Sequence, residues 1–235
     1  MMKRLLIVAL TATAAACGGG SGSSSGTGGS PTTPTTPTNR APVITAVSVS
    51  PAFGVSGVTN FNLSATANDP DGDALSYNWN FGSATASGPT IGTRISGDGA
   101  VAVRLTVQDA KGAQATDSRN VTIGNMTGRW NFIYNGGCSA AVPPVLVLTQ
   151  NSTIVTGTIE SPGPWCGVPA GAGGKLDPAA PASIDGNGKF SGARLKIEGF
   201  LDAFLDGQMD GSGRTITGST RFTNNATGVF EMRKQ

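Results

Sequence analysis

Histidine is absent from the 235-residue sequence, and only 13% of the residues are charged. The lack of histidine excludes Ser-His-Asp and Cys-His catalytic arrangements, together with every metal site built on imidazole ligands. Acid–base chemistry would therefore have to rest on carboxylates. The only glutamates are Glu160, Glu198 and Glu231, and most aspartates lie in glycine-rich turns, where they accept hydrogen bonds from backbone N–H groups.

We accordingly expect no catalytic residue and no cofactor. A carboxylate-dependent hydrolase, or an accessory protein of one, is the enzymatic alternative, and a glycosidase needs two carboxyl groups about 5–10 Å apart. Asp202 and Asp206, if both lie on one strand, would be about 13 Å apart. The stretch Gly173-Gly174-Lys175 resembles a phosphate-binding loop, but proline at position 169 and leucine at position 176 break the pattern.

Aromatic residues are also few, at 6%, whereas glycine occurs 35 times. Glycine is costly inside helices, so this composition favours turn-rich β domains. The length suits two small domains.

The N-terminus has the order of a secretion signal: the basic pair Lys3-Arg4, the apolar run Leu5–Leu10, and small residues up to Cys17. Ala14–Cys17 resembles the lipobox of bacterial lipoproteins, although leucine is commoner at position 14. The resemblance implies that residues 1–16 are a signal peptide, that Cys17 is acylated, with palmitate among the acyl chains, and that the protein is anchored in the cell envelope. The alternative is ordinary signal cleavage, which would leave Cys17 as a thiol.

The glycine that follows Cys17 favours, in a Gram-negative cell, the outer membrane, on its periplasmic face or at the cell surface. Cleavage would also remove Lys3 and Arg4, which leaves equal numbers of basic and acidic residues. The mature protein is then formally neutral, so its composition gives no support for a nucleic-acid partner. Residues 17–40 are rich in Gly, Ser, Thr and Pro and predict a disordered stalk.

From Ala41 the apolar residues alternate with polar ones, as in half-buried strands. The alternating sets are Val43/Val47/Val49, Phe61/Leu63/Ala65/Ala67, Leu75/Tyr77/Trp79/Phe81, Val101/Val103/Leu105/Val107 and Val121/Ile123. Strands at this spacing predict a two-sheet sandwich over residues 41–124.

Four stretches of this region together resemble a polycystic-kidney-disease (PKD) repeat: Ala41–Ile44, Asn68–Asp73, the Leu75–Phe81 strand and Val103–Asp109. The resemblance implies an immunoglobulin-like domain that acts as a spacer or interaction module. The usual Gly-x-Tyr is replaced here by Gly99-Ala100-Val101, which leaves the packing at that corner undetermined.

Residues 128–235 contain eight candidate strands, the first around Trp130–Tyr134, separated by turns such as Asp185–Gly188 and Asp210–Gly213. Such turns form tight hairpins, and a glycine a few residues into the next strand permits a bend. An antiparallel eight-strand meander of this kind most simply closes into a barrel, which loosely resembles the small lipocalin-like barrels. Its interior would either be filled by side chains or be hollow, as in a carrier of a small apolar ligand.

Two sets of side chains are candidate contacts. Asp69, Asp71 and Asp73 place three carboxylates at alternate positions of one turn, where calcium could bind weakly, although a turn that bonds its own side chains is the preferred interpretation. The Tyr77/Trp79/Phe81 face is expected to be core. Trp165 lies in a loop without alternating neighbours, so we predict that it either contacts a ligand or closes the barrel mouth.

Cys138 follows the first barrel strand and Cys166 the third, and in an up-down-up meander these two ends meet at one rim. In an oxidising compartment we therefore predict a Cys138–Cys166 disulfide. The sequence as a whole predicts an all-β, lipid-anchored envelope protein with a binding, adhesive or structural role. A glycan or an envelope protein is the expected partner, and the membrane is contacted through Cys17.

Overall fold

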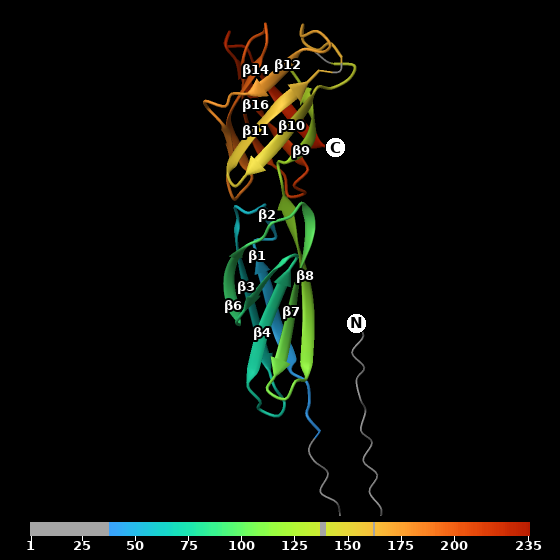
Figure 1. Cartoon of the computed structure of the whole chain (residues 1–235), viewed down its shortest axis with the longest axis vertical. Helices are drawn as coiled ribbons and strands as arrows, with labels where there is room; N and C mark the ends of the chain where they lie inside the picture. The colour runs from blue at the N-terminus through green and yellow to red at the C-terminus, as the bar shows by residue number, and fades with distance from the viewer. Residues whose placement is uncertain (1–37, 137–139, 162) are drawn as a thin grey trace, which may run out of the picture. The chain divides into compact units, whose positions relative to one another are not determined.

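The computed structural model describes residues 38–136, 140–161 and 163–235 (Figure 1). All of the regular secondary structure in these residues is β-strand. Thr38–Gln235 forms one compact unit. Within the described residues, no helix is long and apolar enough to cross a membrane. The all-β prediction is confirmed.

The first half of this unit is a β-sandwich. Its strands are β1 (Val43–Ser50), β2 (Phe53–Val55), β3 (Asn60–Asn68), β4 (Leu75–Phe81), β5 (Ala84–Ser87), β6 (Thr90–Arg94), β7 (Gly99–Asp109) and β8 (Gln114–Gly124). One sheet has the order β1-β3-β6 and the other β2-β8-β7-β4-β5. All pairs are antiparallel except β2 with β8, which run parallel.

The sandwich core is formed by the alternating apolar residues that the sequence indicates. Phe61, Leu63 and Leu105 are fully buried, and Trp79 is 1% exposed. The indole N–H of Trp79 donates to the carbonyl oxygen of Gly88 at 2.9 Å, so the ring is buried without an unpaired polar atom. The expectation that the Tyr77/Trp79/Phe81 face is core is therefore confirmed.

The second half is a closed antiparallel barrel. Its strands are β9 (Gly128–Tyr134), β10 (Val145–Asn151), β11 (Ile154–Glu160), β12 (Gly173–Leu176), β13 (Ala182–Ile184), β14 (Lys189–Ile197), β15 (Ala203–Met209), β16 (Thr215–Phe222) and β17 (Thr227–Lys234). Pairing of β10 with β11 closes the sheet. The short strands β12 and β13 both lie between β11 and β14 and pair with successive parts of them. Together they therefore occupy one strand position, so the nine strands form the predicted eight-strand barrel.

Three glycines allow the barrel strands to bend, as their spacing after the hairpin turns predicts. Gly192 has a φ of +72° and lies in a register shift between Phe190 and Ala193. A Cβ at Gly218 would lie 2.0 Å from the carbonyl oxygen of Asp206, and one at Gly157 would lie 2.4 Å from that of Val147. At Gly218 and Gly157, adjacent strands therefore approach more closely than any side chain would permit, whereas Gly192 is required by its positive φ.

The barrel interior is filled by side chains. Trp130, Leu195 and Met232 are fully buried, and the rings of Phe132 and Phe230 stack with centroids 5.6 Å apart. Val55 of β2 belongs to the same cluster of packed residues. Of the two interiors that the sequence leaves open, the structure has the filled one, so a ligand would have to bind outside the interior.

The stretch that resembles a phosphate-binding loop is a strand. Gly173-Gly174-Lys175 forms most of β12, and Gly174 lies against the backbone of β14, where a Cβ would be 2.6 Å from the carbonyl oxygen of Lys196. Close strand packing therefore explains Gly174 without a nucleotide.

Candidate functional site

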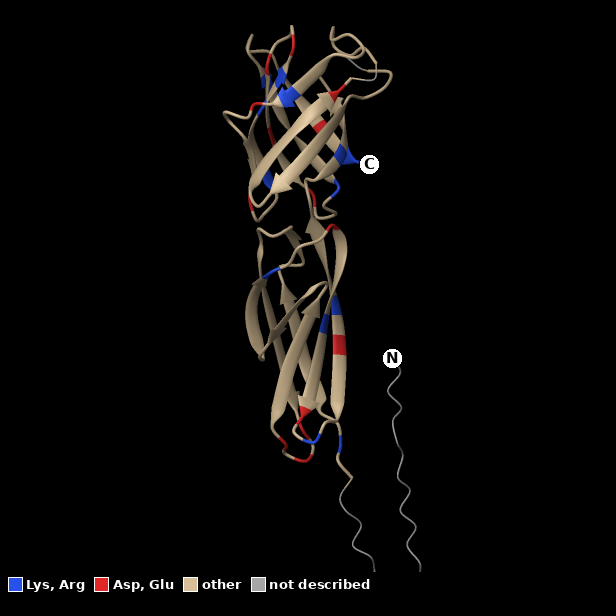
Figure 2. Cartoon of the chain, in the orientation of Figure 1, with Lys and Arg blue, Asp and Glu red and all other residues tan. Residues whose placement is uncertain are grey.

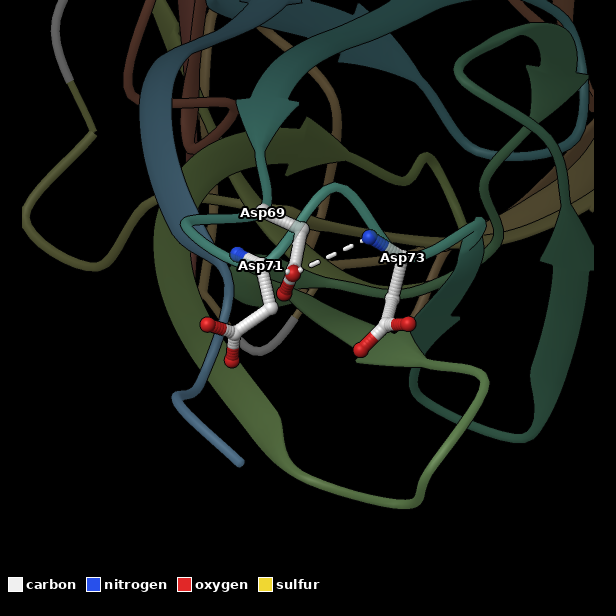
Figure 3. Close-up of side chains that lie close together, drawn as sticks. All are labelled: Asp69, Asp71 and Asp73. Atoms are coloured by element: carbon white, nitrogen blue, oxygen red, sulfur yellow. Dashed lines mark hydrogen bonds between the residues drawn. The ribbon is translucent and has the colours of Figure 1, made fainter. Parts of the chain in front are cut away.

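The acidic turn between β3 and β4 brings its three carboxylates together. Ligand oxygens of Asp69, Asp71 and Asp73 all lie within 4.8 Å of one another, and the side chains point to the same side of the turn (Figure 3). Asp69 Oδ1 also accepts the backbone N–H of Asp71 at 2.8 Å and that of Asp73 at 3.1 Å. The turn thus bonds its own side chains, as the preferred interpretation expects.

Two cationic side chains already neutralise part of this cluster. Arg40 donates its backbone N–H and its Nε–H to the two oxygens of Asp71, each at 2.8 Å, and Lys111 Nζ lies 2.9 Å from Asp73 Oδ2. The hydrogen bonds from Arg40 lower the pKa of Asp71, and the hydrogen bond to Asp73 raises the pKa of Lys111. A metal ion would have to compete with both side chains, which makes calcium a weak candidate.

We expect calcium to change the stability of this turn very little. Between 1 mM calcium and excess chelator, the melting temperature of the mature chain should shift by less than about 2 °C, because a ligand near its dissociation constant stabilises by only about 0.4 kcal/mol. Differential scanning calorimetry measures this shift. A rise of more than about 8 °C that Asp71→Asn abolishes would establish a genuine metal site.

The chain enters the sandwich beside this turn. Asn39 Nδ2 donates to Asp109 Oδ2 at 2.8 Å, while Asp109 Oδ1 accepts the N–H groups of Lys111 and Ala113, each at 2.9 Å. Burial acts to raise the pKa of Asp109, but these hydrogen bonds outweigh it and hold the pKa below its usual value. Asn39 and Arg40 therefore fasten the start of the folded region to two loops at the same end of the sandwich.

Three aspartates of the barrel are bound to cations or to backbone. Lys196 Nζ lies 2.7 Å from Asp177, Arg194 lies 2.6 Å from Asp202, and Asp206 accepts the N–H of Gly192. In the view of Figure 2, acidic and basic residues lie interspersed along the described strands and loops.

These environments do not suit acid catalysis. The hydrogen bond from Lys196 lowers the pKa of Asp177, and that from Arg129 lowers the pKa of Glu160. A general acid needs the opposite shift. Asp202 precedes β15 and Asp206 lies on it, and each has the partner named above, so the two do not form an acid pair that faces a shared cleft.

Trp165 closes one end of the barrel. Its N–H and carbonyl groups bond with those of Val168 across a two-residue turn in which Cys166 and Gly167 both have positive φ, the geometry of a tight hairpin. The side chain is 5% exposed, its ring meets the edge of Phe132, and its indole N–H donates to Ser161 Oγ at 3.0 Å. Of the two roles predicted for Trp165, the structure supports closure of the barrel mouth.

A cup of about 220 Å³ opens to solvent above Trp165. Its lining residues come from β9, from the ends of β14 and β16, from the loops after β9, β11 and β14, and from the β16–β17 hairpin. The lining residues are Tyr134, Gly136, Trp165, Cys166, Val168, Ile197, Phe200, Leu201, Phe222, Asn224 and Ala226. We call this site the rim cup. Trp165 therefore remains a candidate ligand contact, as part of the floor of the rim cup.

The sequence gives little indication of the rim cup. Its residues lie far apart in the chain. Tyr134 of β9 and Phe222 of β16, whose rings meet edge to face at 5.5 Å, belong to two strands that do not pair with each other but flank β17. The one signal is the apolar pair Phe200-Leu201, which follows Gly199 in a turn and remains 40% and 45% exposed.

Two of the predicted modification sites, Cys17 and Cys138, lie outside the described residues. The acylation of Cys17 and the disulfide between Cys138 and Cys166 therefore stay predictions. Cys166 itself lies in the turn that positions Trp165 and lines the rim cup.

Comparison with known proteins identifies the sandwich and leaves the barrel unassigned. Residues 39–123 match the family model described as PKD domain, a range that includes no barrel strand. None of the curated proteins matches the chain. A solved structure from work on carbohydrate-binding modules of the β-sandwich superfamily aligns with 84% of this chain and 93% of its own, at 13% identity and a TM-score of 0.35. That score is too low to support a conclusion about function.

Proposed function

We propose that this chain, in which residues 39–123 form a PKD domain, is a lipid-anchored binding or adhesive protein of the cell envelope. In this proposal Cys17 carries the lipid, residues 17–40 form the stalk, and the PKD domain presents the C-terminal barrel. An outer-membrane location follows from Gly18 if the cell is Gram-negative. The partner is a glycan or an envelope protein.

The rim cup is the observation that carries the binding role. It is a concave, uncharged surface with exposed apolar side chains at its edge, and such surfaces mark interaction sites on otherwise polar proteins. The lowered pKa values of Glu160 and Asp177, each paired with a cationic side chain, give a hydrolytic role no support. The filled barrel gives a lipocalin-like carrier no support either.

The anchor is tested by labelling in cells. A palmitate analogue should tag the wild-type protein, whereas Cys17→Ser should lose the label almost completely and either be released or accumulate as an unprocessed precursor. Fractionation and gel mobility measure both effects. Equal labelling of wild type and variant would disprove the anchor.

The binding role is tested with the whole mature chain immobilised on beads. Retention of a defined glycan or envelope protein should fall when Phe200 is changed to serine. Ile154→Ser is the matched control, because Ile154 is an equally exposed apolar residue, at 48%, that does not line the rim cup. Equal losses in both variants would argue against the rim cup as the contact surface.

A further inference from the structure

The rim cup has an apolar floor. Trp165, Val168 and Ile197 are each 5% exposed, and the indole N–H of Trp165 is already bonded to Ser161. The floor therefore has no free side-chain donor, and a polar ligand group placed there would lose its hydrogen bonds to water without replacement.

The wall and rim add mainly aromatic and aliphatic side chains. Tyr134 and Phe222 form one wall, and Phe200 and Leu201 stand at the rim. Among the described lining residues, the side chains that carry oxygen or nitrogen are Tyr134, with its hydroxyl, and Asn224, whose amide Oδ1 accepts the N–H of Ala226 at 3.0 Å. None of these described residues carries a charge, so a charged ligand would find no counter-charge among them.

Its size limits the ligand further. A volume of about 220 Å³ exceeds the roughly 150 Å³ of an apolar cavity that binds benzene. It is smaller than the roughly 300–1,000 Å³ of sites for drug-sized molecules. The cup therefore suits one fused or substituted ring system. A sugar ring would have the right size, but most of its hydroxyl groups would lack partners.

We infer that the rim cup binds a neutral, mainly apolar ring group with at most one or two polar atoms. This inference rests on the binding role proposed above and names the chemical class that the site accepts. Of the two proposed partners, it leaves the envelope protein, and not the glycan, at the rim cup. The ring packs between Phe200 and Leu201 at the rim and Trp165 at the floor. A single polar atom faces the Tyr134 hydroxyl and the Asn224 amide.

Two dyes with one ring skeleton test the inference on the whole mature chain. N-phenyl-1-naphthylamine is neutral, and 8-anilino-1-naphthalenesulfonate adds a sulfonate to the same rings. The neutral dye should bind with one-to-one stoichiometry and at least about tenfold more tightly, because the sulfonate has no counter-charge in the cup. Fluorescence titration at fixed ionic strength gives both affinities.

Variants at exposed positions locate the binding. Leu201→Asp should weaken binding of the neutral dye at least about fivefold, through lost apolar contact and an added charge. Ile154→Asp, the matched exposed control, should leave the affinity within about twofold.

Equal affinity for both dyes, absence of binding, or an unchanged affinity in Leu201→Asp would overturn the inference. Methyl hexopyranosides that compete at low millimolar concentration would also overturn it, in favour of a sugar site. The dye titrations do not depend on the labelling of Cys17. A wrong ligand class and a wrong lipid anchor would therefore show up in separate experiments.

Discussion

Gly218→Ala is expected to lower the free energy of unfolding by about 3 kcal/mol, a large effect for one added methyl group. The new Cβ would lie 2.0 Å from the Asp206 carbonyl oxygen and 2.6 Å from the Cα of Gly207. Both are backbone atoms of the paired strand β15, so the clash cannot be relieved by a side-chain rotation. The strands must separate, which breaks the hydrogen bonds between β15 and β16.

Gly211→Ala is the matched control. Gly211 lies in the preceding turn, where an added Cβ would meet nothing within 4 Å, so alanine there should change the stability by less than about 0.5 kcal/mol. Urea unfolding followed by the fluorescence of Trp130, which lies in the barrel core, measures both variants. Similar midpoints for the two variants would mean that the strands tolerate a side chain at Gly218.

Loss of the predicted Cys138–Cys166 disulfide should cost about 3–4 kcal/mol, because the bond closes a loop of about 28 residues in the unfolded chain. Among the described residues, Gly136 and Cys166 line the same rim cup. Strands β9 and β11 both pair antiparallel with β10, so their ends reach the same rim. The chain therefore runs toward Cys166 shortly before it reaches Cys138.

The double variant Cys138→Ser/Cys166→Ser distinguishes the effect of the disulfide bond on stability from the effect of replacing the two side chains. Its unfolding midpoint should match that of the wild type under reducing conditions and fall below that of the oxidised wild type. Mass spectrometry of protein from an oxidising compartment should show the loss of two thiol hydrogens. Two free thiols in that protein would refute the bond.

The long strands of the sandwich could be predicted because each buries one face. In β4 and β7 the buried residues alternate strictly, and the register pairs Trp79 with Leu105 and Phe81 with Val103. The shorter strands β2, β5 and β6 lack that signal. β5 reads Ala-Thr-Ala-Ser, and its pairing with β4 depends on the turn at Gly82.

The barrel could be predicted from its turns, because hairpins with Asp, Asn and Gly fix the chain reversals locally. Strand β12 could not, because its two glycines carry no periodicity and its pairing partners are set by closure of the sheet. The rim cup depends on the same closure. A pattern along one segment contains no information about which loops meet at a rim. The apolar Phe200-Leu201 pair after Gly199 is the one sequence signal that could have pointed to this site.

The fastening of Asn39 and Arg40 determines how the sandwich bears a mechanical load. The chain enters where β7 turns into β8, at Asp109 and the acidic turn, while β8 runs on to Gly124, where it pairs with β2 beyond the far end of β1. Tension between Asn39 and the end of β8 therefore pulls β1 along its own axis. The hydrogen bonds between β1 and β3 are then loaded together in shear, instead of opening one after another. A domain loaded in this way resists extension by the whole length of its first strand.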